Sequence, residues 1–453
     1  MDSRLHQAHA AVKRDDWGSA WVLANQVLNE NPDSPEALFL MGTTLRGLGN
    51  IGLAVNCLSK SLAYERKQPN LWMAYAATLH DLNKWEDAID AFSVVNAMLP
   101  DDDMPIANIA ASFNQMGKWH DSITWADKAL ALNPTNYIAK ISKTFASLAL
   151  GRWKDGWESA EYLYGYHLPE RIYCNPEEPQ WDGSPGKTVV VQCDQGIGDQ
   201  IMFSQCLPEM QKDCKKVILE CAPRMVSLFQ RNFPGIDVHG TGKDGGAPWA
   251  KDYEIDAHVH ISYLGKWYRP MDKSFPRKAY LMPDPVLVEK WKAWLQDMPK
   301  PWIGISWKGG IQATQHHLRS MTLPDLGPIM LKKGTFIDMS YMDNGREISA
   351  WNLENANQIV RPPIDTSNYD DTVALAAVLD EIVTVTTTLV HVCGALGRTA
   401  KVLVPSVAQW RYAYKYADGT EMIWYPFRSV RLYRQANGET DWTHAVNRLA
   451  KDL

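Results

Sequence analysis

Residues 187–208 read KTVVVQCDQGIGDQIMFSQCLP, and this stretch decides the fold of the C-terminal two thirds of the chain. Its opening run KTVVVQ is apolar and β-branched, which predicts a buried parallel strand, and residues 200–210 show the apolar period of a helix. Between the two, Gly196 and Gly198 predict a tight turn whose backbone can approach a ligand. Asp199 is therefore expected at the carboxyl edge of a strand, where open α/β sheets bind ligands. A strand-to-helix turn without a ligand explains the same short motif equally well.

The composition is that of a globular protein with two or three domains. Of the 453 residues, 45% are hydrophobic and 22% are charged, which argues against long disordered stretches. The net charge of −6 and the lack of basic runs give no support for a nucleic-acid partner. We expect a cytoplasmic protein, because there is no secretory apolar core and no stretch approaches the roughly 20 apolar residues of a membrane span. The seven cysteines form no Cys-x-x-Cys pair, which predicts reduced, packed thiols.

A repeat with a step of 34 residues occupies the N-terminal third of the chain. Large residues recur at this step at Trp17, Ile51, Trp85, Trp119 and Trp153. Small residues keep the same step at Ala8, Gly42, Ala76, Ala110 and Thr144, and again at Ala20, Ala54, Ala88, Ser122 and Gly156. Prolines close three of the repeats at Pro32, Pro100 and Pro134. Large side chains facing small ones allow two antiparallel helices to pack closely, so the pattern predicts stacked helical hairpins.

This array resembles tetratricopeptide repeats, about four and a half of them over residues 1 to about 160. Such stacks offer a concave surface to peptides or protein segments, although they also serve as braces or dimer contacts. In the O-GlcNAc transferases that carry similar repeats, asparagines along the groove grip peptide backbone. The equivalent positions here are His6, Leu40, Ala74, Asn108 and Ser142, with one asparagine. A clamp of that kind is therefore not expected.

After the repeats the sequence becomes rich in proline and polar residues, which marks a domain boundary. We expect three domains: a repeat array over residues 1–166, a first lobe over 167–298 and a second lobe over 299–453. In the first lobe, short apolar runs at 217–221 and 236–239 alternate with a helical run at 226–232. In the second lobe, strands are expected at 302–307, 335–339, 382–385 and 401–404, and helices at 372–379 and 389–396. Alternation of strands and helices predicts parallel sheets, and therefore an α plus α/β chain.

Three threonines stand at one strand-to-helix junction of the second lobe. Thr386, Thr387 and Thr388 combine hydroxyl groups with the free amides of a helix start, a setting that suits a phosphate. A threonine that only caps the helix explains the same pattern. Acidic runs at residues 101–103 and 370–371 could suggest a metal site. We expect helix caps and solvated charge there instead, because the runs fall at a repeat turn and in a loop before a helix.

The motifs of both lobes together resemble tetratricopeptide-repeat proteins with a glycosyltransferase family nine-like domain and, more distantly, bacterial heptosyltransferases. The resemblance covers essentially the whole chain. In order the motifs are Trp181-Asp182-Gly183, Gln195 to Asp199, Trp307 to Gly310, Arg319-Ser320, Thr386 to Gly397, Gln409 to Tyr412, Trp424 to Pro426 and Val430 to Gln435. The family implies a GT-B fold of two Rossmann-like lobes, with the nucleotide sugar bound mainly by the second lobe and the acceptor by the first.

The resemblance also implies roles for individual residues. Asp199 matches the general base that deprotonates the acceptor, and Lys308 matches a lysine that steadies the diphosphate leaving group without a metal. The residues implied in donor binding are Gly196, Gly198, Lys308, Arg319, Ser320, Thr386, Thr387, Thr388 and His391. Ordinary alternatives are surface charges for Lys308 and Arg319 and a packed histidine for His391.

The leading hypothesis is thus a metal-independent inverting glycosyltransferase that uses a nucleotide sugar as substrate, needs no cofactor and modifies a hydroxyl of a protein or glycan. The repeats would bind the acceptor or a partner, or form a dimer. A rival hypothesis is an inactive binding scaffold, because Thr386 replaces an acidic residue of the heptosyltransferases and a glutamine common near Ser340 is missing. These two departures leave the base and sugar of the donor open. A dehydrogenase is disfavoured, because the turn lacks Gly-x-Gly-x-x-Gly.

Overall fold

The computed structural model describes residues 2–158, 160, 178–193, 196–241, 246–310, 316–414, 419–436 and 441–453. The predicted boundary between residues 166 and 167 falls outside the described residues, and so do Cys174 and Gln195. The chain divides into two compact units, Met1–Ser147 and Leu148–Leu453. Both predicted α/β lobes belong to the second unit.

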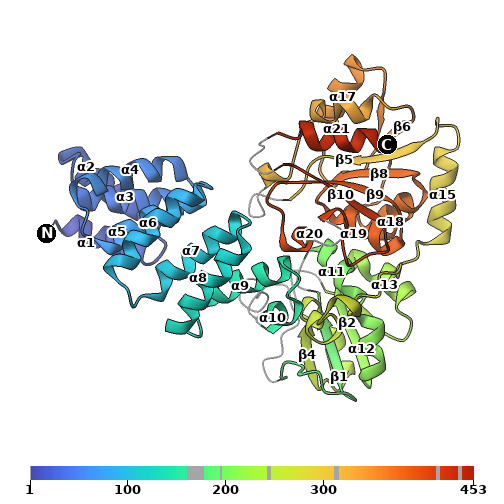
Figure 1. Cartoon of the computed structure of the whole chain (residues 1–453), viewed down its shortest axis with the longest axis horizontal. Helices are drawn as coiled ribbons and strands as arrows, with labels where there is room; N and C mark the ends of the chain where they lie inside the picture. The colour runs from blue at the N-terminus through green and yellow to red at the C-terminus, as the bar shows by residue number, and fades with distance from the viewer. Residues whose placement is uncertain are drawn as a thin grey trace. The chain divides into compact units, whose positions relative to one another are not determined.

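The first unit is a stack of helical hairpins (Figure 1). Its helices are α1 (Ser3–Val12), α2 (Trp17–Glu30), α3 (Pro35–Gly47), α4 (Ile51–Tyr64), α5 (Pro69–Asp81), α6 (Trp85–Met98), α7 (Asp103–Gln115), α8 (Trp119–Leu132) and most of α9 (Tyr137–Ala149). The large residue that recurs every 34 positions is the first residue of the second helix in each hairpin. The sequence period therefore marks helix starts as well as packing positions.

Small residues lie where the helices of a hairpin touch, as the period predicts. Ala54 and Ala88 are fully buried. A Cβ added to Gly42 would lie 2.6 Å from Leu58 Cγ, so a larger residue there would separate α3 from α4. Asn108, the asparagine of the groove positions, donates its amide to the carbonyl oxygen of Met104 in its own helix, at 2.8 Å. The first unit is a tetratricopeptide-like solenoid.

The first complete helix of the second unit is α10 (Trp153–Glu158), and residues 178–298 form a part that we call the four-stranded half (Figure 1). Its strands are β1 (Thr188–Gln192), β2 (Lys216–Cys221), β3 (Asp237–Gly240) and β4 (Ala257–His260). Its α-helices are α11 (Ile197–Ser204), α12 (Leu207–Asp213), α13 (Val226–Asn232), α14 (Gly265–Tyr268) and α15 (Pro285–Leu295). Short 3-10 helices are η2 (Pro223–Met225), η3 (Pro248–Asp252), η4 (Ile261–Leu264) and η5 (Asp272–Ser274).

The six-stranded half comprises residues 299–453. Its strands are β5 (Trp302–Ser306), β6 (Thr335–Asp338), β7 (Ile359–Val360), β8 (Glu381–Val385), β9 (Ala400–Val404) and β10 (Val430–Arg434). Its α-helices are α16 (Gly327–Met330), α17 (Gly345–Glu354), α18 (Tyr369–Val378), α19 (Thr388–Leu396), α20 (Trp410–Ala413) and α21 (Thr443–Lys451), with 3-10 helices η7 (His316–Leu318) and η8 (Pro324–Leu326).

Each half is built on a parallel sheet. The strand orders are β3-β2-β1-β4 and β10-β9-β8-β5-β6-β7. In the first sheet Val190 of β1 stands opposite Ile218 of β2, and β1 is buried along its whole length, as its apolar run predicts. In the first sheet β2 and β3 lie on one side of β1 and β4 lies on the other, and in the second sheet β6 and β7 lie on one side of β5 and β8 lies on the other. The strand order therefore changes direction at β1 and at β5. The carboxyl ends of strands at such switch points are where open parallel sheets bind ligands.

The structure corrects two expectations. The helix expected over residues 200–210 is two helices, α11 and α12, because Pro208 has no amide hydrogen to continue α11 and fits the first turn of a new helix. Asp370 and Asp371 are not solvated loop residues, since they lie in the first turn of α18 and are 1% exposed. Arg231 pairs with Asp370, and Lys290 pairs with Asp371 at 2.8 Å. In the acidic run at residues 101–103, Asp102 caps α7 as expected.

Candidate functional site

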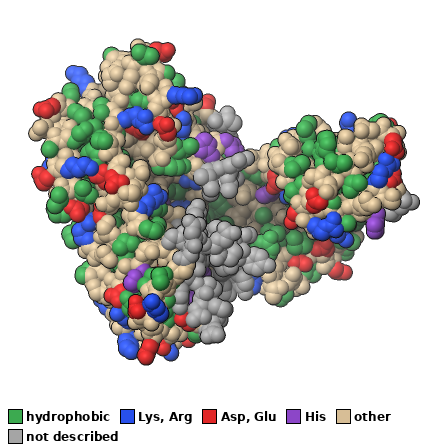
Figure 2. All heavy atoms as spheres, turned by 180° about the vertical axis from the view of Figure 1, so that it is seen from behind, with side chains coloured by type: hydrophobic (Ala, Val, Ile, Leu, Met, Phe, Trp, Pro, Cys, Tyr) green, Lys and Arg blue, Asp and Glu red, His purple; other side chains and the backbone are tan. Residues whose placement is uncertain are grey.

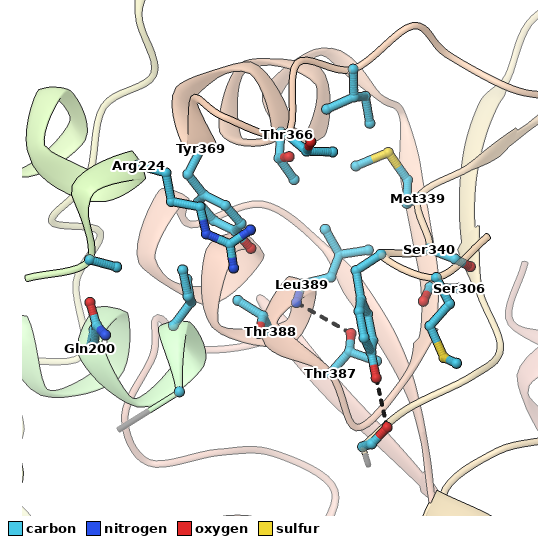
Figure 3. A pocket seen from close by; sticks show the side chains of 18 of the residues that line it. Gln200, Arg224, Ser306, Met339, Ser340, Thr366, Tyr369, Thr387, Thr388 and Leu389 are labelled. Atoms are coloured by element: carbon cyan, nitrogen blue, oxygen red, sulfur yellow. Dashed lines mark hydrogen bonds between the residues drawn. The ribbon is translucent and has the colours of Figure 1, made fainter. Parts of the chain in front are cut away.

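A cavity of about 1090 Å³ lies between the two halves of the second unit (Figure 3). The four-stranded half lines it with residues that end or follow β1, β2 and β3, namely Cys193, Cys221 and Thr241. The six-stranded half contributes Ser306 at the end of β5 and Asp338 at the end of β6. The cavity therefore lies at the carboxyl edges of both parallel sheets, which is where sheets of this kind bind ligands.

Two helices begin at the wall of this cavity. Gly196 and Ile197, at the start of α11, line it from one half, and Thr387 and Thr388, at the start of α19, line it from the other. The Thr387 hydroxyl oxygen accepts a hydrogen bond from the Leu389 amide at 3.3 Å, the bond drawn in Figure 3. The first turn of a helix has amides without intrahelical partners and carries partial positive charge, so both helix starts favour an anion in the cavity.

Charged side chains of both signs surround the cavity. Among the described lining residues these are Arg224, Arg319, Arg361, Glu220, Asp338 and Asp343. Arg361 pairs with Asp343 at 3.0 Å and approaches Asp338 at 3.8 Å. Burial raises the pKa of Asp338. The Arg224 guanidinium extends from the four-stranded half over the ring of Tyr369, with 5.6 Å from its central carbon to the ring centre (Figure 3). Arg224 could thus contact a charged group of a ligand from the four-stranded half, and the Tyr369 ring could contact a planar group from the six-stranded half.

Arg319 lies against the start of α19. Its Nε donates to the Thr386 hydroxyl at 3.0 Å, and its terminal nitrogen donates to the Thr386 carbonyl oxygen. Burial lowers the pKa of Arg319. An arginine guanidinium nevertheless stays protonated in proteins. Its neighbour Ser320 accepts from the Gly309 amide at 3.0 Å and thereby fastens this loop to the segment after β5. Arg319 is thus a fixed cation beside the Thr387 helix start.

Asp199, the expected base, stands in the first turn of α11 and is 17% exposed. Its carboxylate is paired with Arg411, which belongs to α20 of the six-stranded half. Asp199 itself does not line the cavity, but Gly196 and Gln200 on either side of it do. The carboxylate is therefore near the cavity wall, with its charge compensated across the two halves.

Lys308, the expected leaving-group cation, also has an ionic partner. Its ammonium group contacts Glu347 of α17, and the same carboxylate accepts from the Trp307 indole at 3.2 Å and from the Leu323 amide at 3.1 Å. Burial acts to raise the pKa of Glu347, but these hydrogen bonds outweigh it and lower the pKa. Lys308 does not line the cavity either, and its ammonium group pairs with Glu347 of α17 instead of facing the cavity.

His391 is a packed, uncharged residue in this structure. It is 4% exposed, with Nδ1 at 2.6 Å from the Tyr425 hydroxyl and Nε2 at 3.2 Å from the Tyr412 hydroxyl. Burial and, to a lesser degree, the charges of Arg411 and Arg319 hold its pKa well below the usual value. A neutral imidazole held by two hydroxyls supports the walls of the site, while its position behind Gly198 keeps it from the cavity.

The ten residues singled out in the sequence divide into three groups. Gly196, Arg319, Thr387 and Thr388 line the cavity. Gly198, Asp199, Thr386 and His391 stand directly behind that lining through the contacts given above. Lys308 and Ser320 make contacts within the six-stranded half that do not reach the lining.

Sequence reasoning missed the partners of these residues. Glu347 and Arg411 neutralise the two charged groups expected to be catalytic, and Asp338 and Arg224 line the cavity without having been singled out. One signal was available, because Arg411 belongs to the Gln-Trp-Arg-Tyr motif of the resemblance. Asp338 could have been found as the acidic residue that ends the second strand of its sheet, a common position for polar ligand contacts.

Other kinds of site find little support in the described parts of the chain. No group of three or more His, Cys, Asp and Glu side chains there is placed to hold a metal ion. No helix among those residues is long and apolar enough to cross a membrane. Acidic and basic side chains are interspersed over the face seen in Figure 2, which is not the pattern of a polyanion-binding surface.

Comparison with known proteins supports the repeats most directly. A family model described as anaphase-promoting complex, cyclosome, subunit 3 matches residues 13–95, within the first unit. Protein FlbA of Caulobacter vibrioides is 26% identical over 425 residues, which cover 89% of this chain and 70% of FlbA. That alignment is long enough to include both units. The chain is thus a tetratricopeptide-like repeat protein that is similar to FlbA over most of its length.

Solved structures of MamA are similar to part of the chain. A crystal structure of MamA is 18% identical, covers 34% of this chain and 89% of its own, and superposes with a TM-score of 0.30. A MamA fragment from Desulfovibrio magneticus is 19% identical, covers 36% of this chain and 93% of its own, and has a TM-score of 0.32.

Proposed function

We propose that the second unit is a metal-independent inverting glycosyltransferase of the GT-B type, which moves a sugar from a nucleotide sugar to a hydroxyl of a protein or glycan. The observation that carries the proposal is a cavity lined by strand ends of both sheets, with the starts of α11 and α19 at its wall and Arg319 beside one of them. Such a cavity offers a diphosphate site on one wall and room for an acceptor on the other.

In the proposed reaction the diphosphate lies at the start of α19, where the partial positive charge of the helix start, the Thr388 hydroxyl and Arg319 compensate its charge. The acceptor hydroxyl attacks the anomeric carbon from the opposite face, the bond to the diphosphate breaks, and the configuration inverts. Asp199 takes the hydroxyl proton. It does so through Oδ2, the carboxylate oxygen on the side of Gly196 in the lining, while Oδ1 keeps its contact with Arg411. Lys308 would assist the leaving group only after releasing Glu347.

The proposed role of the first unit is to bind the acceptor protein or another partner, or to form a dimer. The tetratricopeptide-like stack supports this proposal, because stacks of this kind present an extended concave surface. The Asn108 amide is bonded to the Met104 carbonyl oxygen of its own helix. Side chains other than groove asparagines would therefore bind the acceptor protein or partner.

The test is donor breakdown by the full chain. UDP-, GDP-, ADP-, dTDP- and CMP-sugars are added one at a time, and released nucleotide is measured for the wild type, for Asp199→Asn and for Asp297→Asn, a matched change at an exposed carboxylate. We expect release from at least one donor, a loss of about 10²-fold or more in Asp199→Asn, and no change in the control. No release from any donor, together with no nucleotide binding by calorimetry, would refute the proposal.

A second candidate function is a binding scaffold that no longer transfers sugar. The observation that favours it is the pairing of Asp199 with Arg411 and of Lys308 with Glu347, which neutralises both charged groups that the reaction needs. Nucleotide binding to the wild type without turnover of any donor would favour this alternative.

A further inference from the structure

We propose that Arg411 is the positioning residue for Asp199, and that α10 and its aromatic neighbours hold Arg411 in place. This inference rests on the proposed function and adds to it a group that no motif of the resemblance assigns a role. The starting observation is the ion pair between Arg411 and Asp199, which joins residues 212 positions apart and belonging to different halves of the unit.

Arg411 is held at more than one point. One terminal nitrogen contacts the Asp199 carboxylate, and the other donates to the Gln409 side-chain oxygen at 2.6 Å. The guanidinium also lies 5.4 Å from the ring centre of Trp410, and the side chain is 13% exposed. A planar guanidinium fixed at two nitrogens has little freedom to rotate, so it sets the direction of the carboxylate that it binds.

The short helix α20 that carries Arg411 is itself fixed by residues on both sides of Arg411. The Trp410 ring meets Trp157 of α10 edge-on, with centres 5.9 Å apart at 89°. Tyr412 contacts Nε2 of His391 through its hydroxyl at 3.2 Å. Both Trp410 and Tyr412 are buried. Trp410 and Tyr412 are thus both fixed by packing, and Arg411, which lies between them in the sequence, is held in contact with Asp199.

A second set of contacts ties α10 to the end of α20. The hydroxyl of Tyr414 and the indole nitrogen of Trp153 each donate to the Asp272 carboxylate at 2.6 Å. The rings of Trp153 and Tyr414 lie 5.1 Å apart. A Cβ on Gly151 would lie 2.0 Å from the Tyr414 ring, so the turn before α10 needs a glycine to fit against it. The last helix of the repeat pattern therefore braces the segment that positions Asp199.

Arg411 should affect ionisation as well as direction. The groups that influence Asp199 or its surroundings are two cations, Arg411 and Arg319, and the neutral hydroxyls of Tyr412 and Tyr425. Burial raises the pKa of Tyr412 to about 12, so neither cation is offset by a tyrosinate near neutral pH. A neighbouring guanidinium favours the carboxylate form, which is the form that can accept a proton from the acceptor.

The test uses the full chain with the donor that the wild type cleaves. In Arg411→Gln we expect kcat to fall about 10- to 100-fold, the scale of a misplaced catalytic group, with KM for the donor within about twofold of the wild type. The acid limb of the kcat profile should move to higher pH. Arg411→Lys should recover part of kcat, and Arg431→Gln, which removes an exposed arginine paired at 3.8 Å with Asp452, should behave as the wild type.

The double variant Asp199→Asn with Arg411→Gln decides whether Arg411 acts through Asp199. We expect it to be no slower than Asp199→Asn alone, because a positioning group has nothing left to position. Multiplicative losses, or an Arg411→Gln variant with wild-type kcat and pH profile, would overturn the inference while leaving the proposed function intact. Absence of turnover in the wild type would instead remove the proposed function, and this inference with it.

Discussion

Replacing Gly198 by alanine tests why the turn after β1 needs its second glycine. The sequence alone suggested that both glycines serve the approach of a ligand. In the structure a Cβ on Gly198 would lie 2.8 Å from Cδ2 of His391 and 3.4 Å from the Thr388 backbone. His391 cannot withdraw easily, because Tyr425 and Tyr412 hold its two ring nitrogens. We therefore attribute Gly198 to the close packing of α11 on α19.

The expected magnitude follows from two opposing terms. Overpacking at such a contact costs about 1–3 kcal/mol, and alanine in a helix recovers up to about 1 kcal/mol relative to glycine. The net effect of Gly198→Ala is thus a loss of about 1 kcal/mol in the free energy of unfolding. Gly196 provides a matched control, because its φ is −58° and, among the described residues, an added Cβ would meet Asp199 Oδ2 alone, at 3.7 Å. Gly196→Ala should be neutral or stabilise by up to about 1 kcal/mol.

Denaturant unfolding of both variants and the wild type, followed by tryptophan fluorescence, measures this difference. We expect Gly198→Ala to unfold at lower denaturant than Gly196→Ala, with a gap of about 1–2 kcal/mol between them. Equal stability of the two variants would refute the packing role, and a loss of stability in Gly196→Ala alone would reverse the assignment of the two glycines.

Three further variants give separate expectations, each measured by denaturant unfolding. Glu347→Gln should lose about 1–3 kcal/mol at neutral pH, since it removes the charge-assisted bonds to Lys308 and to a backbone amide. Because the fold lowers the pKa of Glu347, its stabilisation is present above the usual 4.5 and is lost as pH falls through the folded-state pKa, so the gap to the variant should close in acid. The fold also holds the pKa of His391 down, so the unfolded chain takes up the proton first. The wild type should therefore lose stability relative to His391→Asn as pH falls below about 6.5, and a parallel pH dependence of the two would contradict this. Thr387→Val should cost about 1 kcal/mol, because the Leu389 amide loses its cap.

Much of the fold was predictable because its signals are local. The period of 34 residues gave the helix starts of the repeats, and buried runs such as those of β1 and β5 gave the strands, since both follow from neighbouring residues. The break between α11 and α12 was missed, although Pro208 marks it, because the apolar pattern continues through it. The strand β7 has two residues and therefore no period that a pattern could show.

The site was less predictable, because its ion pairs depend on tertiary packing. Thr387 and the two glycines of the turn after β1, Gly196 and Gly198, could be placed from strand-end motifs alone. The partners could not, since Glu347 lies 39 residues from Lys308, and Arg411 lies 212 residues from Asp199. For the same reason Asp370 was expected in solvent, although Arg231, 139 residues away, pairs with it in the interior. Local patterns identify which side chains carry charge, but only the packed structure shows which oppositely charged side chain each of them contacts.

The central claim is that the cavity between the two sheets holds a nucleotide sugar. A crystal structure of the full chain with the nucleotide released from its donor tests this most directly. We predict the diphosphate at the start of α19, within hydrogen-bond distance of Thr388 and Arg319, and the base elsewhere in the same cavity. A nucleotide bound at any other surface, or a cavity that stays empty at saturating nucleotide, would contradict the account.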